Sequence, residues 1–157
     1  MMYLLRHLLD TMTQDYALTF RPLNLAEVKR LSIALKKNNL CVIPSDYANF
    51  LCWSDGLVWR NLELFSVYSY ERPDTVYPHP TLLEIQKKHL LEDAFPHKII
   101  LGRELESIIC YDEQKRLYEI LERFSYQPVI QFARFVDLLY FYVGKERSST
   151  VPTETAS

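Results

Sequence analysis

Stretches with helical spacing of apolar residues alternate with strand-like stretches along the chain. Near the N-terminus this spacing predicts a helix over residues 1–12, with Leu5, Leu8 and Met12 on one face. A second helix is predicted after Asn24, because Asn24 and Glu27 form a capping-box pattern. Leu23 and Val28 stand in the positions of a hydrophobic staple, and Asn38 and Asn39 are expected to end the helix. Its expected inner face consists of Leu25, Val28, Leu31, Ser32 and Leu35.

The middle of the chain is rich in strand-forming residues. Four strands are predicted, over residues 57–59, 62–68, 98–102 and 107–112, the first two turning at Arg60 and Asn61. Three prolines between residues 71 and 80 exclude a central strand or a helix interior, so this segment is expected to be a surface loop. Thr81 is then placed to cap a helix from Leu82 to about Leu91.

The last third contains one ambiguous segment and one predicted helix. Residues 115–124 fit helical spacing and strand alternation equally well. Pro128 suits the first turn of a helix, and an apolar stripe continues to Val143 before Gly144. The composition turns polar from residue 145, which predicts a mobile tail.

The segment from Ile43 to Leu57 carries the most specific motif in the chain. Pro44 stops the preceding segment, Ser45 is placed to cap a new helix, and Asp46 lies where the helix dipole favours an anion. The helix is expected to run to about Asp55 and to end at Gly56, with its Tyr47, Phe50 and Leu51 facing inward.

This segment resembles the signature of the SUKH superfamily, the Smi/Knr group. That signature reads Leu or Ile, Pro, any residue, an acidic residue and Tyr, then Phe-Leu, and soon afterwards Asn-Gly or Asp-Gly. Weaker support comes from Gly102, from the pair Tyr111-Asp112, and from the aromatic residues of the last predicted helix. Asp55-Gly56 stands where Asn-Gly is commoner, which indicates a divergent branch.

The resemblance implies an α+β fold, with helices packed on a curved, mainly antiparallel sheet. It implies a single domain over residues 1–143, followed by the polar tail over residues 144–157. It also favours a strand for residues 115–124, because in members of this family the chain reverses direction after the Tyr-Asp pair. The length of 157 residues, with 48% hydrophobic residues, fits one domain with one core.

Composition excludes several functional classes. A net charge of −2 gives no electrostatic case for nucleic acid or an anionic membrane. No apolar run approaches the roughly 20 residues needed to span a bilayer, and the N-terminus is a poor signal peptide. Three scattered cysteines suggest neither a disulfide framework nor a zinc site, so a cytoplasmic location is the simplest expectation.

No motif predicts a catalytic residue, a metal ligand or a cofactor. Helix capping explains Ser45, and no nucleophile elbow surrounds it. His79, His89 and His97 have spacings that fit no compact metal motif, and three isolated glycines cannot form a phosphate loop. We therefore expect a protein that is not an enzyme.

Aromatic residues give the remaining indication of function. We predict a partner-binding face that consists of Trp53, Trp59, Tyr68 and Tyr70, flanked by Asp55 and Glu63. Trp and Tyr dominate interface hot spots because they bury a large area at little conformational cost. The competing interpretation is that Trp59 and Tyr68 are core residues of strands.

The resemblance implies protein recognition as the function. Bacterial relatives most often act as immunity proteins, which bind and block a toxin; the alternative is a regulatory or scaffold protein of the type linked to fungal cell-wall synthesis. The expected partner is accordingly a toxin domain or a regulatory protein, and the chain itself is expected to be a monomer or a weak homodimer.

Overall fold

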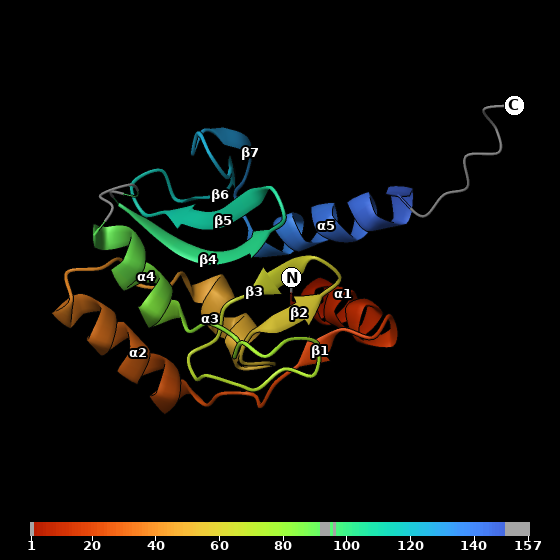
Figure 1. The fold of residues 1–157 in the computed structure, drawn as a ribbon, viewed down its shortest axis with the longest axis horizontal. Helices are drawn as coiled ribbons and strands as arrows, with labels where there is room; N and C mark the ends of the chain where they lie inside the picture. The colour runs from red at the N-terminus through yellow and green to blue at the C-terminus, as the bar shows by residue number, and fades with distance from the viewer. Residues whose placement is uncertain (1, 92–94, 96, 150–157) are drawn as a thin grey trace, which may run out of the picture.

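A computed structural model describes residues 2–91, 95 and 97–149 of the chain. Within these residues, five helices pack against one seven-stranded sheet (Figure 1). The helices are α1 (Met2–Gln14), α2 (Leu25–Lys37), α3 (Ser45–Leu51), α4 (Leu82–Leu91) and α5 (Phe135–Ser149). The strands are β1 (Leu18–Thr19), β2 (Leu57–Trp59), β3 (Leu62–Leu64), β4 (Lys98–Glu104), β5 (Ser107–Asp112), β6 (Leu117–Glu122) and β7 (Pro128–Phe132).

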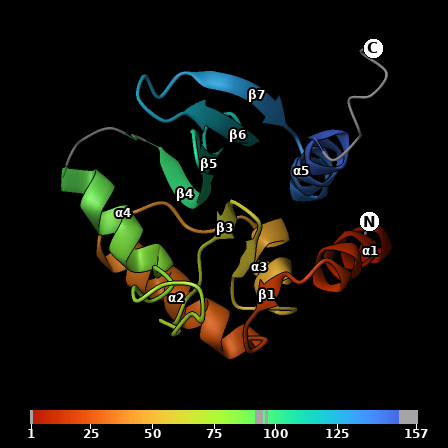
Figure 2. The same ribbon diagram turned by 45° about the vertical axis from the view of Figure 1, so that its right-hand side comes forward.

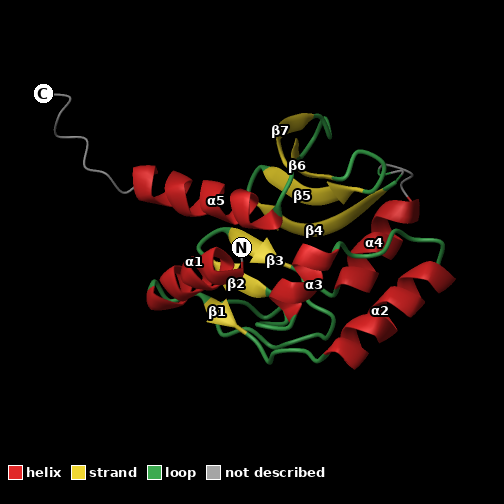
Figure 3. Cartoon of the chain, turned by 180° about the vertical axis from the view of Figure 1, so that it is seen from behind, coloured by secondary structure: helices red, strands yellow, loops and turns green. Residues whose placement is uncertain are grey.

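The sheet is an antiparallel meander in which each strand pairs with the next one along the chain, from β1 to β7. It curves, and the helices cover it from two sides: α1 and α5 lie on one side, whereas α2 and α4 lie on the other (Figure 2). Seen from behind, α3 lies at the centre, below α5, which it contacts (Figure 3). The predicted α+β class is therefore confirmed.

The core forms where α3 meets the sheet and the start of α5. Phe50 and Leu51 are fully buried, as predicted, and the ring of Phe50 lies 5.6 Å from that of Phe135. The buried hydroxyl of Tyr47 donates a hydrogen bond to the carbonyl oxygen of Phe65 at 2.5 Å, with the carbonyl oxygen of Leu101 3.2 Å away. Tyr47 thus ties α3 to the middle of the sheet.

Local capping signals in the sequence are largely confirmed. The Asn24 side chain accepts a hydrogen bond from the backbone of Glu27 at 2.9 Å, and the Glu27 side chain accepts one from Asn24 at 3.1 Å. The hydroxyl of Thr81 accepts a bond from the amide of Glu84 at the start of α4. Leu25 is an exception to the predicted inner face of α2, because it is 67% exposed.

The helix of the motif segment differs from the prediction at both ends. Pro44 occupies the capping position, and Ser45 makes no capping hydrogen bond. The helix also ends at Leu51 instead of near Asp55. The chain leaves it because Ser54 accepts a hydrogen bond from the amide of Phe20, and the amide of Asp55 donates to the carbonyl of Arg21.

The C-terminal third contains the largest error of the sequence prediction. Residues 117–122 form a strand, as the resemblance favoured, but Pro128–Phe132 form β7 and not the start of a helix. Phe132, which the predicted helical stripe included, pairs instead with β6, where it lies opposite Tyr118. Helix α5 begins only at Phe135 and continues through Gly144 to Ser149. The rest of the predicted tail, residues 150–157, lies outside the described residues.

Candidate functional site

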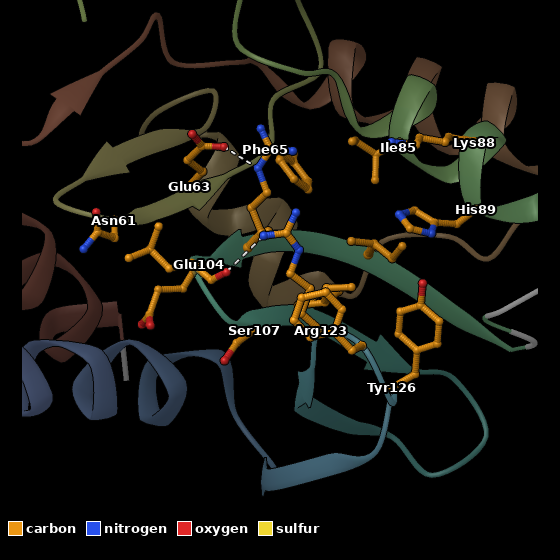
Figure 4. A pocket seen from close by; sticks show the side chains of 16 residues that line it. Asn61, Glu63, Phe65, Ile85, Lys88, His89, Glu104, Ser107, Arg123 and Tyr126 are labelled. Carbon is orange, nitrogen blue, oxygen red and sulfur yellow. Dashed lines mark hydrogen bonds and ion pairs between the residues drawn. The ribbon is translucent and has the colours of Figure 1, made fainter. Parts of the chain in front are cut away.

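A groove with a volume of about 470 Å³ lies between α4 and the strands β3, β4 and β5 (Figure 4). Its apolar surface comes from Phe65, Ile85, Ile100 and Ile108. Figure 4 shows the side chains of α4 on one side of the groove and those of the strands and turns on the other. The lining residues therefore come from four segments that are far apart in the sequence.

The short strand β3 creates the space for the groove. It pairs with β4 only at Glu63 and Leu64, opposite Arg103 and Gly102, so the longer β4 extends past it. Beyond that point the side-chain amide of Gln86 on α4 takes the place of a neighbouring strand. Its oxygen accepts from the amide of Ile100 at 2.8 Å, and its nitrogen donates to the carbonyl of the same residue at 2.6 Å. This buried pair of hydrogen bonds fixes α4, which forms one wall of the groove, relative to β4, which forms part of its floor.

Gly102 is required where β3 and β4 meet beside the groove. A Cβ atom at this position would lie 2.4 Å from the carbonyl oxygen of Glu63, which is backbone and has no freedom to move aside. Glycine permits this close approach of two strands. The same residue was part of the sequence resemblance.

The acidic side chains of the groove are paired within the protein. Glu63 accepts hydrogen bonds from Arg72 at 2.8 Å and from Arg103 at 2.6 Å. Burial alone would raise the pKa of Glu63, but the two arginines together hold it below its usual value. Glu104 accepts from the ammonium group of Lys145 at 2.9 and 3.1 Å.

Two hairpin turns form an exposed rim, which consists of Leu105, Arg123 and Phe124. Leu105 follows β4 and is 64% exposed, whereas Phe124 follows β6 and is 81% exposed. The amide of Arg123 donates to the carbonyl of Glu106 at 3.0 Å, which holds the two turns side by side. The Arg123 guanidinium donates to the carbonyl of Leu105 at 3.3 Å and lies 5.7 Å from the ring centre of Phe124.

Three aromatic rings close the far end of the groove. The ring centre of Phe95 lies 4.8 Å from that of His89 on α4 and 4.8 Å from that of Tyr126 after β6, both in edge-on arrangements. Edge-on packing of this kind is favourable for aromatic rings. It connects α4 to the β6–β7 turn across the groove.

The motif segment places its acidic residue in the interior. Asp55 is fully buried, and its carboxylate accepts hydrogen bonds from the amides of Val67 at 2.6 Å and Tyr68 at 3.1 Å, and from the hydroxyl of Tyr70 at 2.7 Å. Burial raises the pKa of Asp55 above its ordinary value, although these three donors oppose the shift. Asp55 therefore holds the chain after β3, which explains why β3 ends at Leu64 and not at residue 68.

The predicted aromatic face does not form one exposed surface. Trp59 is only 4% exposed, and its indole nitrogen donates to Asp15 at 3.0 Å. Trp53 is half-buried, and Tyr68 is 40% exposed with the guanidinium of Arg21 5.4 Å from its ring centre. Of the six predicted residues, Glu63 alone lines the groove, and buried Asp55 and Trp59 cannot contribute to an exposed face.

Reactive chemistry has little support in the described residues. No group of three or more His, Cys, Asp or Glu side chains among them could hold a metal ion. Burial raises the pKa of both Cys41 and Cys110 to about 12, so both thiols stay protonated at neutral pH and are poor nucleophiles. None of the described helices is long and apolar enough to cross a membrane.

Sequence reasoning missed the rim and the floor of the groove. The local signal was an apolar residue at the centre of an otherwise polar turn: Phe124 between Arg123 and Ser125, and Leu105 between Glu104 and Glu106. Which turns lie side by side depends on the order of the strands, which the sequence does not specify locally.

Comparisons with known proteins do not identify the chain. No family model matches it, and neither the curated proteins nor the solved structures contain a significant match.

Proposed function

We propose that this chain is a protein-binding domain that docks a partner on the groove and its rim. The observation that carries the proposal is the rim itself: an exposed Phe and an exposed Leu flank an Arg beside an apolar groove. Aromatic and Arg side chains around a desolvated centre are the composition of interface hot spots. An exposed apolar patch beside a preformed groove is typical of an interaction surface.

The mode of action that we propose is occlusion. A rigid groove wall, fixed by Gln86, would cover part of a partner's surface without rearrangement of the sheet. The resemblance of Ile43–Leu57 to the Smi/Knr group supports an immunity protein that blocks a toxin as the first candidate. A regulatory or scaffold protein is the second candidate, and it would use the same surface.

The test is titration calorimetry of the chain against the protein encoded by the adjacent gene, which is the candidate toxin if the chain is an immunity protein. Phe124→Ala should weaken binding by about 2 kcal/mol or more, roughly thirtyfold, because a central aromatic hot spot is lost. Tyr77→Ala is the matched control, since Tyr77 is an aromatic residue that is 74% exposed in the proline-rich loop. Loss of affinity in Tyr77→Ala with Phe124→Ala unchanged would move the interface to that loop.

Inhibition separates the two candidate functions. If the chain is an immunity protein, it should abolish the activity of the partner at a one-to-one ratio, and Phe124→Ala should require a higher concentration. A regulatory protein would bind without stoichiometric inhibition.

A further inference from the structure

We infer that the groove receives an acidic segment of the partner, with an aliphatic or aromatic side chain on the apolar floor and carboxylates on Arg123 and Lys88. This inference rests on the proposed function and names the chemistry of the partner. The inference assigns a positive charge to the binding surface. The sequence predicted the opposite charge, with the acidic residues Asp55 and Glu63 flanking the binding face.

The charges that line the groove are unequally compensated. Its two acidic residues, Glu63 and Glu104, are each engaged by arginine or lysine side chains of the same protein. Arg123 and Lys88 also line it, and within the described residues neither has an acidic partner. Among the described residues the groove therefore presents two positive charges without an acidic partner, although the chain as a whole carries −2.

Arg123 is preorganised to bind a carboxylate. Its contacts with the carbonyl of Leu105 and the ring of Phe124 hold the guanidinium at the rim, beside the apolar floor. One carbonyl acceptor leaves most of its five donors available, and a planar guanidinium matches a carboxylate with two parallel hydrogen bonds. Because the side chain is already positioned, less conformational entropy is lost on binding.

Lys88 supplies the second charge from the opposite wall. It lies on α4, whereas Arg123 lies beyond the end of β6, and Figure 4 shows them on different sides of the groove. Ile100 of β4 and Ile108 of β5 also line the groove. An occupant that pairs with Arg123 and Lys88 and also covers the apolar floor needs an apolar side chain with carboxylates nearby. An acidic peptide segment has this composition. A nucleic acid strand would satisfy the charges, but it would place phosphates against a surface with only two free cations.

The test is a heteronuclear NMR titration of the intact chain with two capped synthetic pentapeptides. One peptide contains leucine and phenylalanine interspersed with glutamate and aspartate, and the other has every carboxylate replaced by its amide. We expect the acidic peptide to shift the methyl signals of Ile100 and Ile108 and the side-chain signal of Arg123. The amide peptide should bind at least tenfold more weakly, and added salt should weaken the acidic peptide.

Matched variants test the two cations separately. Arg123→Gln and Lys88→Gln should each weaken the acidic peptide at least fivefold and leave the amide peptide unchanged. Arg116→Gln is the control for Arg123, because it lies at the opposite end of β6, and Lys87→Gln is the control for the neighbouring Lys88. Both control variants should bind the acidic peptide as tightly as the parent chain.

Three results would overturn the inference: equal affinity for the two peptides, no shift of the floor signals at millimolar acidic peptide, or equally tight binding of a single-stranded oligonucleotide at the same signals. These results are distinguishable from failure of the proposed function. If the partner protein still shifts Ile100 and Ile108, the groove binds it through other chemistry; if it shifts neither signal, the groove is not the interface.

Discussion

The motif segment, Ile43–Leu57, and the groove rim, Leu105, Arg123 and Phe124, treat their polar and aromatic side chains in opposite ways. In the motif segment Ser54 and Asp55 are buried and have partners: Asp55 accepts three hydrogen bonds, and the Ser54 hydroxyl donates to the carbonyl of Gly56 at 2.6 Å. At the rim the aromatic ring of Phe124 is exposed, and among the described residues the guanidinium of Arg123 contacts the carbonyl of Leu105 and that ring.

The contrast shows that the most specific sequence motif and the proposed binding surface are different parts of this fold. Pro44 occupies the capping position of α3, Asp55 holds the chain after β3, and Tyr47 and Phe50 lie in the core. The rim has no motif, because the fold places few constraints on exposed side chains in two hairpin turns. The predictions below therefore separate the two regions by stability: the motif segment should be costly to change, and the rim should not.

The largest loss is expected for Phe50→Ala. Phe50 is fully buried against Tyr47 and Phe135, so truncation removes apolar contacts and leaves a cavity at the centre of the core. The free energy of unfolding should fall by about 3–5 kcal/mol, the usual range for a buried phenylalanine. A denaturant titration measures it, and a loss below about 1 kcal/mol would contradict the core assignment.

A smaller loss is expected for Asp55→Ala. The substitution leaves the amides of Val67 and Tyr68 and the hydroxyl of Tyr70 without their acceptor, at about 1–3 kcal/mol for each buried donor that stays unsatisfied. Removal of a desolvated carboxylate partly offsets this cost, so we expect a net loss of about 2–4 kcal/mol. Tyr70→Phe removes one donor only and should cost about 1 kcal/mol. Equal losses in the two variants would show that the amides find other partners.

A third effect should appear as a pH dependence through His79. The ring is fully buried, and its Nε2 donates to the carbonyl of Leu64 at 2.7 Å, because a carbonyl can only accept. Its Nδ1 has no hydrogen-bond partner in the described part of the chain. Burial lowers the pKa of His79 below its ordinary 6.5, although the bond to Leu64 opposes the shift.

The sign of this dependence follows from proton binding. Below about pH 6.5 the unfolded chain binds a proton at this histidine while the folded chain keeps it neutral, so stability should fall as the pH is lowered through this range. The charges of Glu63, Arg72 and Arg103 also act on the ring. His79→Gln retains a donor for Leu64 and should flatten the profile between pH 7 and pH 5, measured by urea titrations. An unchanged slope would assign the dependence to other groups.

The fold was predictable where local rules apply. The capping box at Asn24, the cap at Thr81 and the proline-rich loop are properties of neighbouring residues, and the structure confirms them. The end of β6 and the start of α5 were not predictable in this way, because Pro128–Phe132 fits a helical stripe and an edge strand equally well. Only pairing with β6, a contact through space, decides between them.

The candidate site was less predictable than the fold. Sequence reasoning selected Trp59 and Asp55 because aromatic and acidic residues cluster there, but burial depends on the tertiary packing. Glu63 lines the groove, yet its charge is compensated by Arg72 and Arg103. Arg72 lies nine residues from Glu63 in the sequence, and Arg103 lies forty residues from it. Ion pairs between residues this far apart cannot be recognised from the order of residues in the sequence.

The smallest effect on stability is expected at the rim. It tests most directly the contrast between the rim and the buried motif segment. Phe124→Ala and Leu105→Ala remove side chains that are 81% and 64% exposed, so each should change the free energy of unfolding by less than about 0.5 kcal/mol. Arg123→Gln should behave in the same way, because among the described residues its guanidinium donates one hydrogen bond, to the carbonyl of Leu105 at the long distance of 3.3 Å. Denaturant titrations of the three variants measure this against the Phe50→Ala loss. A loss above about 1.5 kcal/mol in Phe124→Ala would mean that the ring packs within the fold, and its exposure would no longer indicate a partner.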